Sequence, residues 1–123
     1  MMIILDSNII IYSVQKEHQA LRQWLLTIQP AYSIISKVEV LGYWNLSLQQ
    51  AQGITSVLSA MREIALTTKQ CERAISLRQM KKMSLGDALI AAAALDYEMP
   101  LATRNTKDFD WISGLSLINP MDK

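Results

Sequence analysis

The chain has 123 residues, of which half are apolar and 19% are charged, and its formal net charge is +1. This size suits one domain with one hydrophobic core, spanning residues 1–123, and the composition excludes a disordered chain. The near-neutral charge argues against a protein that holds nucleic acid by bulk electrostatics alone. It leaves nuclease chemistry open, because bound metal ions offset acidic side chains.

A single cysteine excludes an internal disulfide and a cysteine metal cluster. The sequence has no run of about 18 apolar residues, so it predicts no membrane span. The apolar start, residues 1–5, meets Asp6 at once and has no basic leader, unlike a signal peptide. We therefore expect a soluble, cytoplasmic domain.

The first predicted elements alternate between strand and helix. Residues 2–5 form an apolar run typical of a strand buried on both faces, and a helix begins near residue 8. Apolar residues at helical spacing predict a second helix over 17–29, ended by Pro30. A second strand is expected over residues 32–35.

A third helix is predicted to begin at Ser36. Ser36 is its expected N-cap, and Glu39 three residues later completes the Ser-x-x-Glu pattern of a capping box. We expect this helix to continue through Trp44, with the indole of that residue in the core.

Two more helical stretches, 48–61 and 68–83, lie on either side of a strand candidate at residues 64–66. Ser84 is expected to begin the next helix. That helix is apolar nearly all round from residue 88 to 95 and is rich in strong helix formers, which predicts a central, tightly packed position.

Strand candidates at 101–103 and 115–118 complete the pattern. Strands that alternate with helices of about 10–15 residues favour right-handed crossovers and a parallel sheet. We predict a three-layer α/β/α domain with a central parallel sheet of four or five strands. The cleft of such a sheet lies at the carboxyl ends of its strands. Asp6, Glu39 and the segment 103–108 are therefore expected at the same edge.

The acidic residues after the predicted strands each have a plain structural explanation when taken alone. Asp6 can cap a helix, and Glu39 can be a capping-box partner. Asp87 can favour a helix dipole, and Asp108 can be a solvated loop residue. Their convergence is more informative, because at least three carboxylates near one cleft repel one another strongly without a cation.

Carboxylates without nearby histidine or cysteine point to a hard cation. Mg²⁺ and Mn²⁺ are satisfied by carboxylate oxygens and water. With a phosphodiester substrate, such an ion activates and orients a water and neutralises charge on the phosphoryl oxygens. The residues leave open whether one ion or two are used.

Four motifs follow one another along the chain. They are Leu-Asp-Ser-Asn-Ile at 5–9, Ser-Lys-Val-Glu-Val-Leu-Gly at 36–42, Ser-Leu-Gly-Asp-Ala-Leu-Ile-Ala-Ala at 84–92 and Ala-Thr-Arg-Asn-Thr-Lys-Asp-Phe at 102–109. In this order they resemble PIN-domain ribonucleases, and most of all the VapC-type toxins of toxin–antitoxin pairs. The resemblance spans the whole chain. It implies a metal-dependent endonuclease that hydrolyses RNA, with Asp6, Glu39 and Asp87 as ligands of Mg²⁺ or Mn²⁺.

The resemblance also implies supporting polar residues. Asn8, Ser84 and Thr103 would orient the carboxylates or the substrate phosphate. The fourth acidic position stays open, because some family members carry the acid where this chain has Asn105 and others where it has Asp108. We include Asp108 among the catalytic and metal-binding candidates, and Asn105 among the supporting ones.

Basic side chains near the predicted cleft can hold RNA phosphates or simply face solvent. They are Arg78, Lys81, Lys82, Arg104 and Lys107. Of these, Arg104 is the one that we include as a candidate for contact with substrate. Trp111, in the loop after Asp108, can pack in the core or stack on a base.

The resemblance implies two protein partners. One is a small antitoxin whose tail places a basic side chain among the acids, and the other is a second copy of the chain in a homodimer. The high apolar fraction and the seven methionines are compatible with association, although a well-filled core explains them equally.

Three other classes of protein share some of these features. A haloacid-dehalogenase-like phosphatase needs a second Asp two residues after the first, where this chain has Asn8. A dinucleotide-binding domain needs a Gly-x-Gly-x-x-Gly turn, which the chain lacks. A catalytically silent PIN-fold module that binds RNA or protein is the alternative that the residues leave open.

Overall fold

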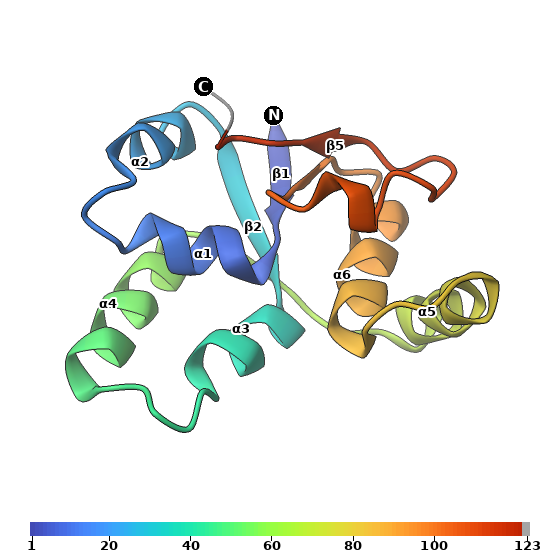
Figure 1. Ribbon diagram of the computed structural model, residues 1–123, viewed down its shortest axis with the longest axis horizontal. Coiled ribbons are helices and arrows are strands. Elements are labelled where there is room, and N and C mark those ends of the chain that lie inside the picture. Colours follow the sequence, from blue (N-terminus) through green and yellow to red (C-terminus); the bar gives the residue numbers. More distant parts are fainter. Residues whose placement is uncertain (122–123) are drawn as a thin grey trace.

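The computed structural model describes residues 1–121, and within them it has one parallel sheet of five strands flanked by helices (Figure 1). The strand order is β3-β2-β1-β4-β5. The strands are β1 (Met2–Leu5), β2 (Gln29–Ser33), β3 (Arg62–Ile64), β4 (Leu101–Ala102) and β5 (Leu117–Ile118). The predicted three-layer α/β/α fold is confirmed.

The helices cover both faces of the sheet. They are α1 (Ser7–Ser13), α2 (Gln19–Leu25), α3 (Ile34–Leu41), α4 (Leu48–Ser59), α5 (Thr68–Met80) and α6 (Leu85–Asp96), with a short 3₁₀ helix, η1 (Thr106–Asp108). Helices α1, α2 and α4 lie on one side of the sheet, and α5 and α6 lie on the other (Figure 1). From β1 the chain adds β2 and then β3 on one side of the sheet, and later β4 and β5 on the other side. The strand order therefore reverses between β1 and β4, and such sheets place their functional cleft at this point.

Alternate residues of β1 enter the two halves of the core. Ile4 belongs to the cluster under α5 and α6, whereas Ile3 and Leu5 belong to the cluster under α1, α2 and α4. All three side chains are almost fully buried. The continuous apolar run at the start of the chain is thus explained by a strand covered on both faces.

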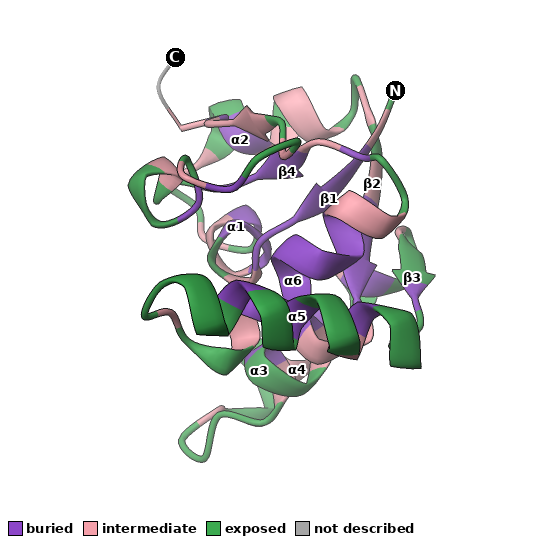
Figure 2. Ribbon diagram, turned by 90° about the vertical axis from the view of Figure 1, so that its right-hand side faces the viewer, coloured by how far each residue is buried: buried purple, intermediate pink, exposed green. Residues whose placement is uncertain are grey.

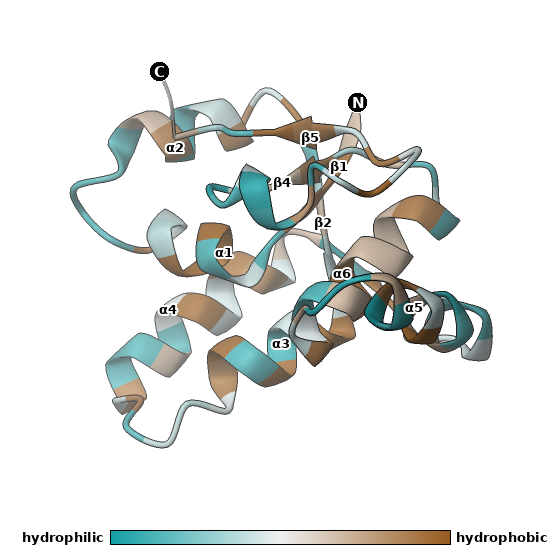
Figure 3. Ribbon diagram, turned by 45° about the vertical axis from the view of Figure 1, so that its right-hand side comes forward, coloured by the Kyte–Doolittle hydropathy of each residue, from teal (hydrophilic) through white to brown (hydrophobic). Residues whose placement is uncertain are grey.

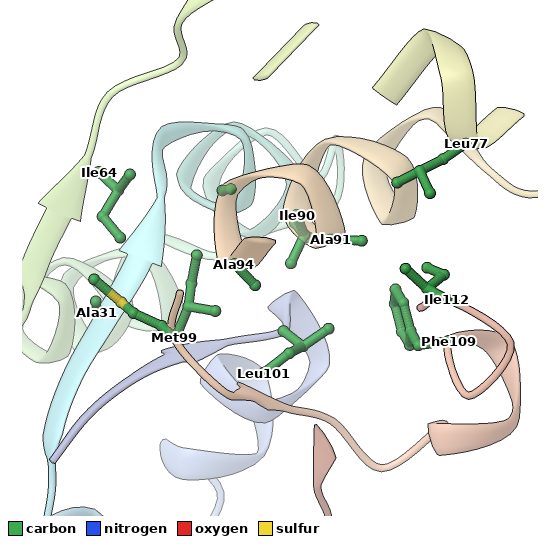
Figure 4. Close-up of a cluster of buried hydrophobic side chains, with 12 residues drawn as sticks. Ala31, Ile64, Leu77, Ile90, Ala91, Ala94, Met99, Leu101, Phe109 and Ile112 are labelled. Atoms are coloured by element: carbon green, nitrogen blue, oxygen red, sulfur yellow. The ribbon is translucent and has the colours of Figure 1, made fainter. Parts of the chain in front are cut away.

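Helix α6 is the central helix of the domain, as its sequence predicts. Ala88 and the run 91–94 are buried, and these small side chains allow the helix to lie close to the sheet. Figure 4 shows Ile90 and Ala94 of α6 near Leu101 of β4. Helix α5 covers α6 and exposes its outer side (Figure 2), which carries much of the hydrophilic surface in that region (Figure 3).

Several predicted boundaries are wrong. Helix α2 ends at Leu25, and Pro30 lies inside β2, where its neighbour in the register is Ile3. Helix α3 ends at Leu41, because Gly42 forms its C-cap. Trp44 consequently lies in a loop with 87% of its surface exposed, and the expectation that it packs in the core is wrong. Among the described residues, no helix is long and apolar enough to cross a bilayer.

We predict that Ala91→Leu lowers the free energy of unfolding by about 1–3 kcal/mol, because the added atoms overfill a fully buried site between α6 and the sheet. Thr55→Leu, on the exposed face of α4, is the control and should change it by less than about 0.5 kcal/mol. Urea denaturation measures both. Equal effects at the two positions would contradict the packing assigned to α6.

Candidate functional site

The carboxylate of Asp6 lies at the carboxyl end of β1, where the strand order reverses. The main-chain N–H of Asp6 donates to the carbonyl oxygen of Ala102, at 2.9 Å, which continues the pairing of β1 with β4. One carboxylate oxygen accepts from the N–H of Ser7, at 2.8 Å, so Asp6 caps α1. The other accepts from the hydroxyl of Thr103, also at 2.8 Å. Asp6 is buried, at 6% exposure, and its carboxylate is fixed by the ends of two adjacent strands.

Glu39 faces the same region from α3. Its Oε1 accepts a hydrogen bond of 2.6 Å from the hydroxyl of Ser7, and the hydroxyl oxygens of Ser7 and Ser36 are 3.0 Å apart. The expected capping box is wrong, since Ser33 at the end of β2 is the N-cap and its hydroxyl accepts from the N–H of Ile35. The helix therefore begins earlier than predicted, and Glu39 is not used as a cap.

Asp87 lies in the first turn of α6. Ser84 is the N-cap of that helix, as predicted, and its hydroxyl accepts from the N–H of Asp87 at 3.1 Å. The carboxylate of Glu39 occupies the space beside Gly86, and its carboxyl carbon lies 3.1 Å from where a Cβ would stand. The absence of a side chain at Gly86 thus brings the acid of α3 next to the helix that carries Asp87.

The segment after β4 provides the remaining candidates. Thr103 is fully buried, and besides donating to Asp6 it accepts from the N–H of Asn105 at 3.1 Å. Asp108 is exposed at the end of η1. Asn8 is exposed in the first turn of α1, and the exposed Arg104 places its guanidinium 5.6 Å from the centre of the Tyr12 ring.

The acids of this region act on one another electrostatically. Burial raises the pKa of Asp6 above its ordinary value, and the charges of Glu39 and Asp108 raise it further. The hydrogen bonds from Thr103 and Ser7 act in the opposite direction.

Burial also raises the pKa of Asp87, followed by the negative charge of Asp6. The charges of Asp108 and Glu39 act in the same direction, and the hydrogen bond with Ser84 opposes them. The four acids, which come from four separate segments, therefore share one negative field, and we name them the acidic edge.

The oxygen donors of the acidic edge have the chemistry that a hard divalent cation prefers. The acids are also near enough to repel one another, and a cation would relieve the repulsion that raises the pKa of Asp6 and Asp87. Within residues 1–121, however, no three His, Cys, Asp or Glu side chains stand close enough to hold a metal ion as they are arranged. The donor set fits Mg²⁺ or Mn²⁺, and the carboxylates would have to approach one another to bind it.

Three residues near the acidic edge were not predicted to belong to the site, although Ser36 was expected to cap a helix. Ser7, Ser36 and Gly86 all lie within the recognised motifs, but their contacts join segments far apart in the chain. The only local signal was the position of Ser7 and Gly86 directly beside an acid that was already a candidate.

The fold and the acidic edge define a three-layer domain with carboxylates gathered at the reversal of the strand order. The PIN domain family matches residues 3–114, so the chain belongs to this family. No protein with a curated function matches the sequence.

Solved structures resemble the chain over nearly its whole length. A toxin–antitoxin complex from Klebsiella pneumoniae is 33% identical, with a TM-score of 0.80 and coverage of 98% of both chains. VapBC2 from Rickettsia felis, bound to a DNA fragment from its promoter, is 25% identical, with a TM-score of 0.83 and coverage of 97% of this chain and 98% of the other. DNA-bound VapBC from Salmonella typhimurium, at 18% identity and a TM-score of 0.82 with 98% of each chain covered, shares the fold.

We predict a pH-dependent gain in stability from Asp6→Asn in protein freed of divalent metal by EDTA. Because the pKa of Asp6 is raised in the folded state, its stabilising contribution is present below about pH 4 and is lost as the pH rises through the raised value. Asp6→Asn should therefore unfold at a higher temperature than the parent protein at pH 7, and the difference should shrink towards pH 4. Thermal unfolding followed by circular dichroism measures this.

Asp110→Asn is the control, because Asp110 is exposed and is not among the charges that act on Asp6 or Asp87. It should behave like the parent protein at both pH values. A gain from Asp6→Asn that is the same at pH 4 and pH 7 would contradict the proposed cost of ionising Asp6.

Proposed function

We propose that this protein is a Mg²⁺- or Mn²⁺-dependent endoribonuclease that acts in the cytoplasm as the toxin of a toxin–antitoxin pair. The observation that carries this proposal is the acidic edge: Asp6, Glu39, Asp87 and Asp108 come from four segments and share one field at the reversal of the strand order. The family supports a nuclease, and the neighbouring toxin–antitoxin complexes support the toxin role.

In this proposal Asp6, Glu39 and Asp87 hold the metal, with Asp108 as the fourth acid. When bound, the ion would activate a water for attack on the phosphodiester and neutralise charge on the phosphoryl oxygens. Asp6 is the most firmly placed of these acids, because each of its oxygens accepts a hydrogen bond. Asp108 is exposed and free to adapt to the substrate.

The supporting residues have separate tasks. Thr103 holds the carboxylate of Asp6, and Ser84 fixes the turn from which Asp87 extends. The N–H of Asn105 orients the hydroxyl of Thr103, and we propose that the side-chain amide oxygen of the exposed Asn105 binds the metal or a water. Asn8 and Arg104 are exposed in the segments that follow Asp6 and Thr103, and we propose that they contact the RNA phosphates.

An antitoxin would need to block the acidic edge. A groove of about 380 Å³ leads to Glu39 between α1, α3 and α4, and its walls are mostly apolar. We propose that an apolar segment of the antitoxin occupies this groove and places a basic side chain among the acids. The exposed Ile75, Met80 and Leu85 on α5 and α6 are the surface that we propose for a homodimer.

The catalytically silent module is a second candidate, because the acids do not form a ready ligand group within the described part of the chain. The two candidates differ in their response to Mn²⁺. A nuclease should gain thermal stability as Mn²⁺ is added, because binding to the folded state alone stabilises it, whereas a silent module should not.

We predict that the purified protein cleaves RNA only with Mg²⁺ or Mn²⁺ and that EDTA stops it. Asp6→Asn and Asp87→Asn should reduce the rate by orders of magnitude while the fold survives, and Asp108→Asn should cost less than Asp6→Asn. Asp110→Asn is the matched control and should cleave normally. Gel analysis of a labelled RNA and circular dichroism of each variant make the measurement. Normal cleavage by Asp6→Asn, or an absent Mn²⁺ response, would reject the proposal.

We also predict that Gly86→Ala separates activity from stability. The new Cβ would displace the flexible carboxylate of Glu39, so cleavage should fall at least about tenfold. Stability should stay equal or rise by up to about 1 kcal/mol, since alanine favours a helix over glycine. Gly53→Ala in α4 is the control, because a Cβ there meets open space. Gly53→Ala should gain stability without losing activity. Full activity of Gly86→Ala would show that cleavage does not depend on where the Glu39 carboxylate lies.

A further inference from the structure

A second cavity adjoins the acidic edge on the side of α6 and η1. Its volume is about 510 Å³, and Asp87 and Asp108 form part of its wall. The rest of the wall is of a different character, because it includes Lys81, Lys82, Lys107 and Trp111. We name it the Trp111 pocket. It joins two candidate acids to an aromatic side chain and to three positive charges.

Trp111 is held in a fixed position at this pocket. Its indole N–H donates to the carbonyl oxygen of Asp108 at 3.0 Å, and the ring packs against the core cluster that contains Phe109 and Ile112. The side chain remains partly exposed, and it lines the cavity. A flat ring that is already ordered loses little conformational freedom when another flat group stacks on it.

The three lysines of this cavity come from two parts of the chain. The ammonium of Lys81 lies 5.6 Å from the centre of the Trp111 ring, and Lys82 follows it in the turn between α5 and α6. Arg78 steadies that turn by donating to the carbonyl oxygen of Met83. Lys107 comes from η1 on the other side. No carboxylate within salt-bridge distance of these three lysines is found among the described residues, so their charge is available to a ligand.

We propose that the Trp111 pocket binds one unpaired nucleotide of the RNA next to the bond that is cut, with the base on Trp111 and its phosphate on the lysines. This inference rests on the proposed function, because it assigns the strand beside the scissile bond. Stacking requires a base that is not paired in a duplex, so the pocket selects single-stranded or looped RNA. An acidic peptide would use the lysines but has no flat group for the ring.

The test measures binding without cleavage. In a Trp24→Phe/Trp44→Phe background, Trp111 is the single tryptophan, and its fluorescence reports the pocket directly. The protein is titrated in EDTA with a single-stranded RNA of about ten nucleotides, with the same RNA in a duplex, and with hexaglutamate. We expect saturable quenching by the single strand, and weak or no quenching by the duplex and the peptide. Equal quenching by duplex or peptide, or none by the single strand, would overturn the proposal.

Two variants add an independent readout. Trp111→Leu should weaken binding of the single strand about tenfold and that of the duplex less than about twofold. Lys81→Ala/Lys82→Ala should reduce the salt dependence of binding, by a slope of about 0.7 for each phosphate that the lysines no longer neutralise. Lys69→Ala, at the other end of α5, is the control and should change neither the affinity for the single strand nor the salt dependence of binding. If Trp111→Leu does not fold, the fluorescence titration and the lysine variant still test whether the pocket binds single-stranded RNA.

This design separates the pocket from the proposed function. If the protein cleaves RNA with Mg²⁺ but its Trp111 fluorescence does not change with single-stranded RNA, only the proposal for the Trp111 pocket is rejected. Saturable quenching without any metal-dependent cleavage would reject the nuclease and leave an RNA-binding pocket.

Discussion

The structure depends on one costly placement, the burial of the Asp6 carboxylate where β1 and β4 separate. A buried charge is unfavourable unless it is paired or hydrogen-bonded, and here two donors, from Ser7 and Thr103, offset part of that cost. Neighbouring acids increase the cost instead of reducing it, because they raise the pKa of Asp6. A site arranged in this way sacrifices stability, which is expected where a fold serves a ligand.

The packing of α6 explains how acids from distant segments reach Asp6. Small side chains along this helix let it approach the sheet closely, and Gly86 leaves room for Glu39 at its first turn. Ser84 fixes the same turn through its cap. Different residues of the same helix therefore set the core packing and the position of Glu39, so a larger side chain at Gly86 should affect function before stability.

Local sequence patterns predicted those features that local physics controls. The apolar run before Asp6 predicted a buried strand of a parallel sheet with acids at its carboxyl edge. The run of small apolar residues after Ser84 predicted the central helix. The patterns could not predict that Ser33, and not Ser36, caps α3, because both serines suit a cap and the choice depends on where β2 ends. They placed Trp44 in the core for a similar reason, since helical spacing cannot show that Gly42 ends the helix.

The low net charge also has a structural explanation. Four of the eleven acidic residues form the acidic edge, and three lysines line the Trp111 pocket beside it, so a near-neutral total conceals local charge of both signs. In the proposed function, a cation would neutralise the first group, and the second group would hold phosphates of the RNA. A basic antitoxin side chain could replace the cation among the acids. In the proposed function, the repulsion among the acids would thus favour both activation by metal and inhibition by a partner.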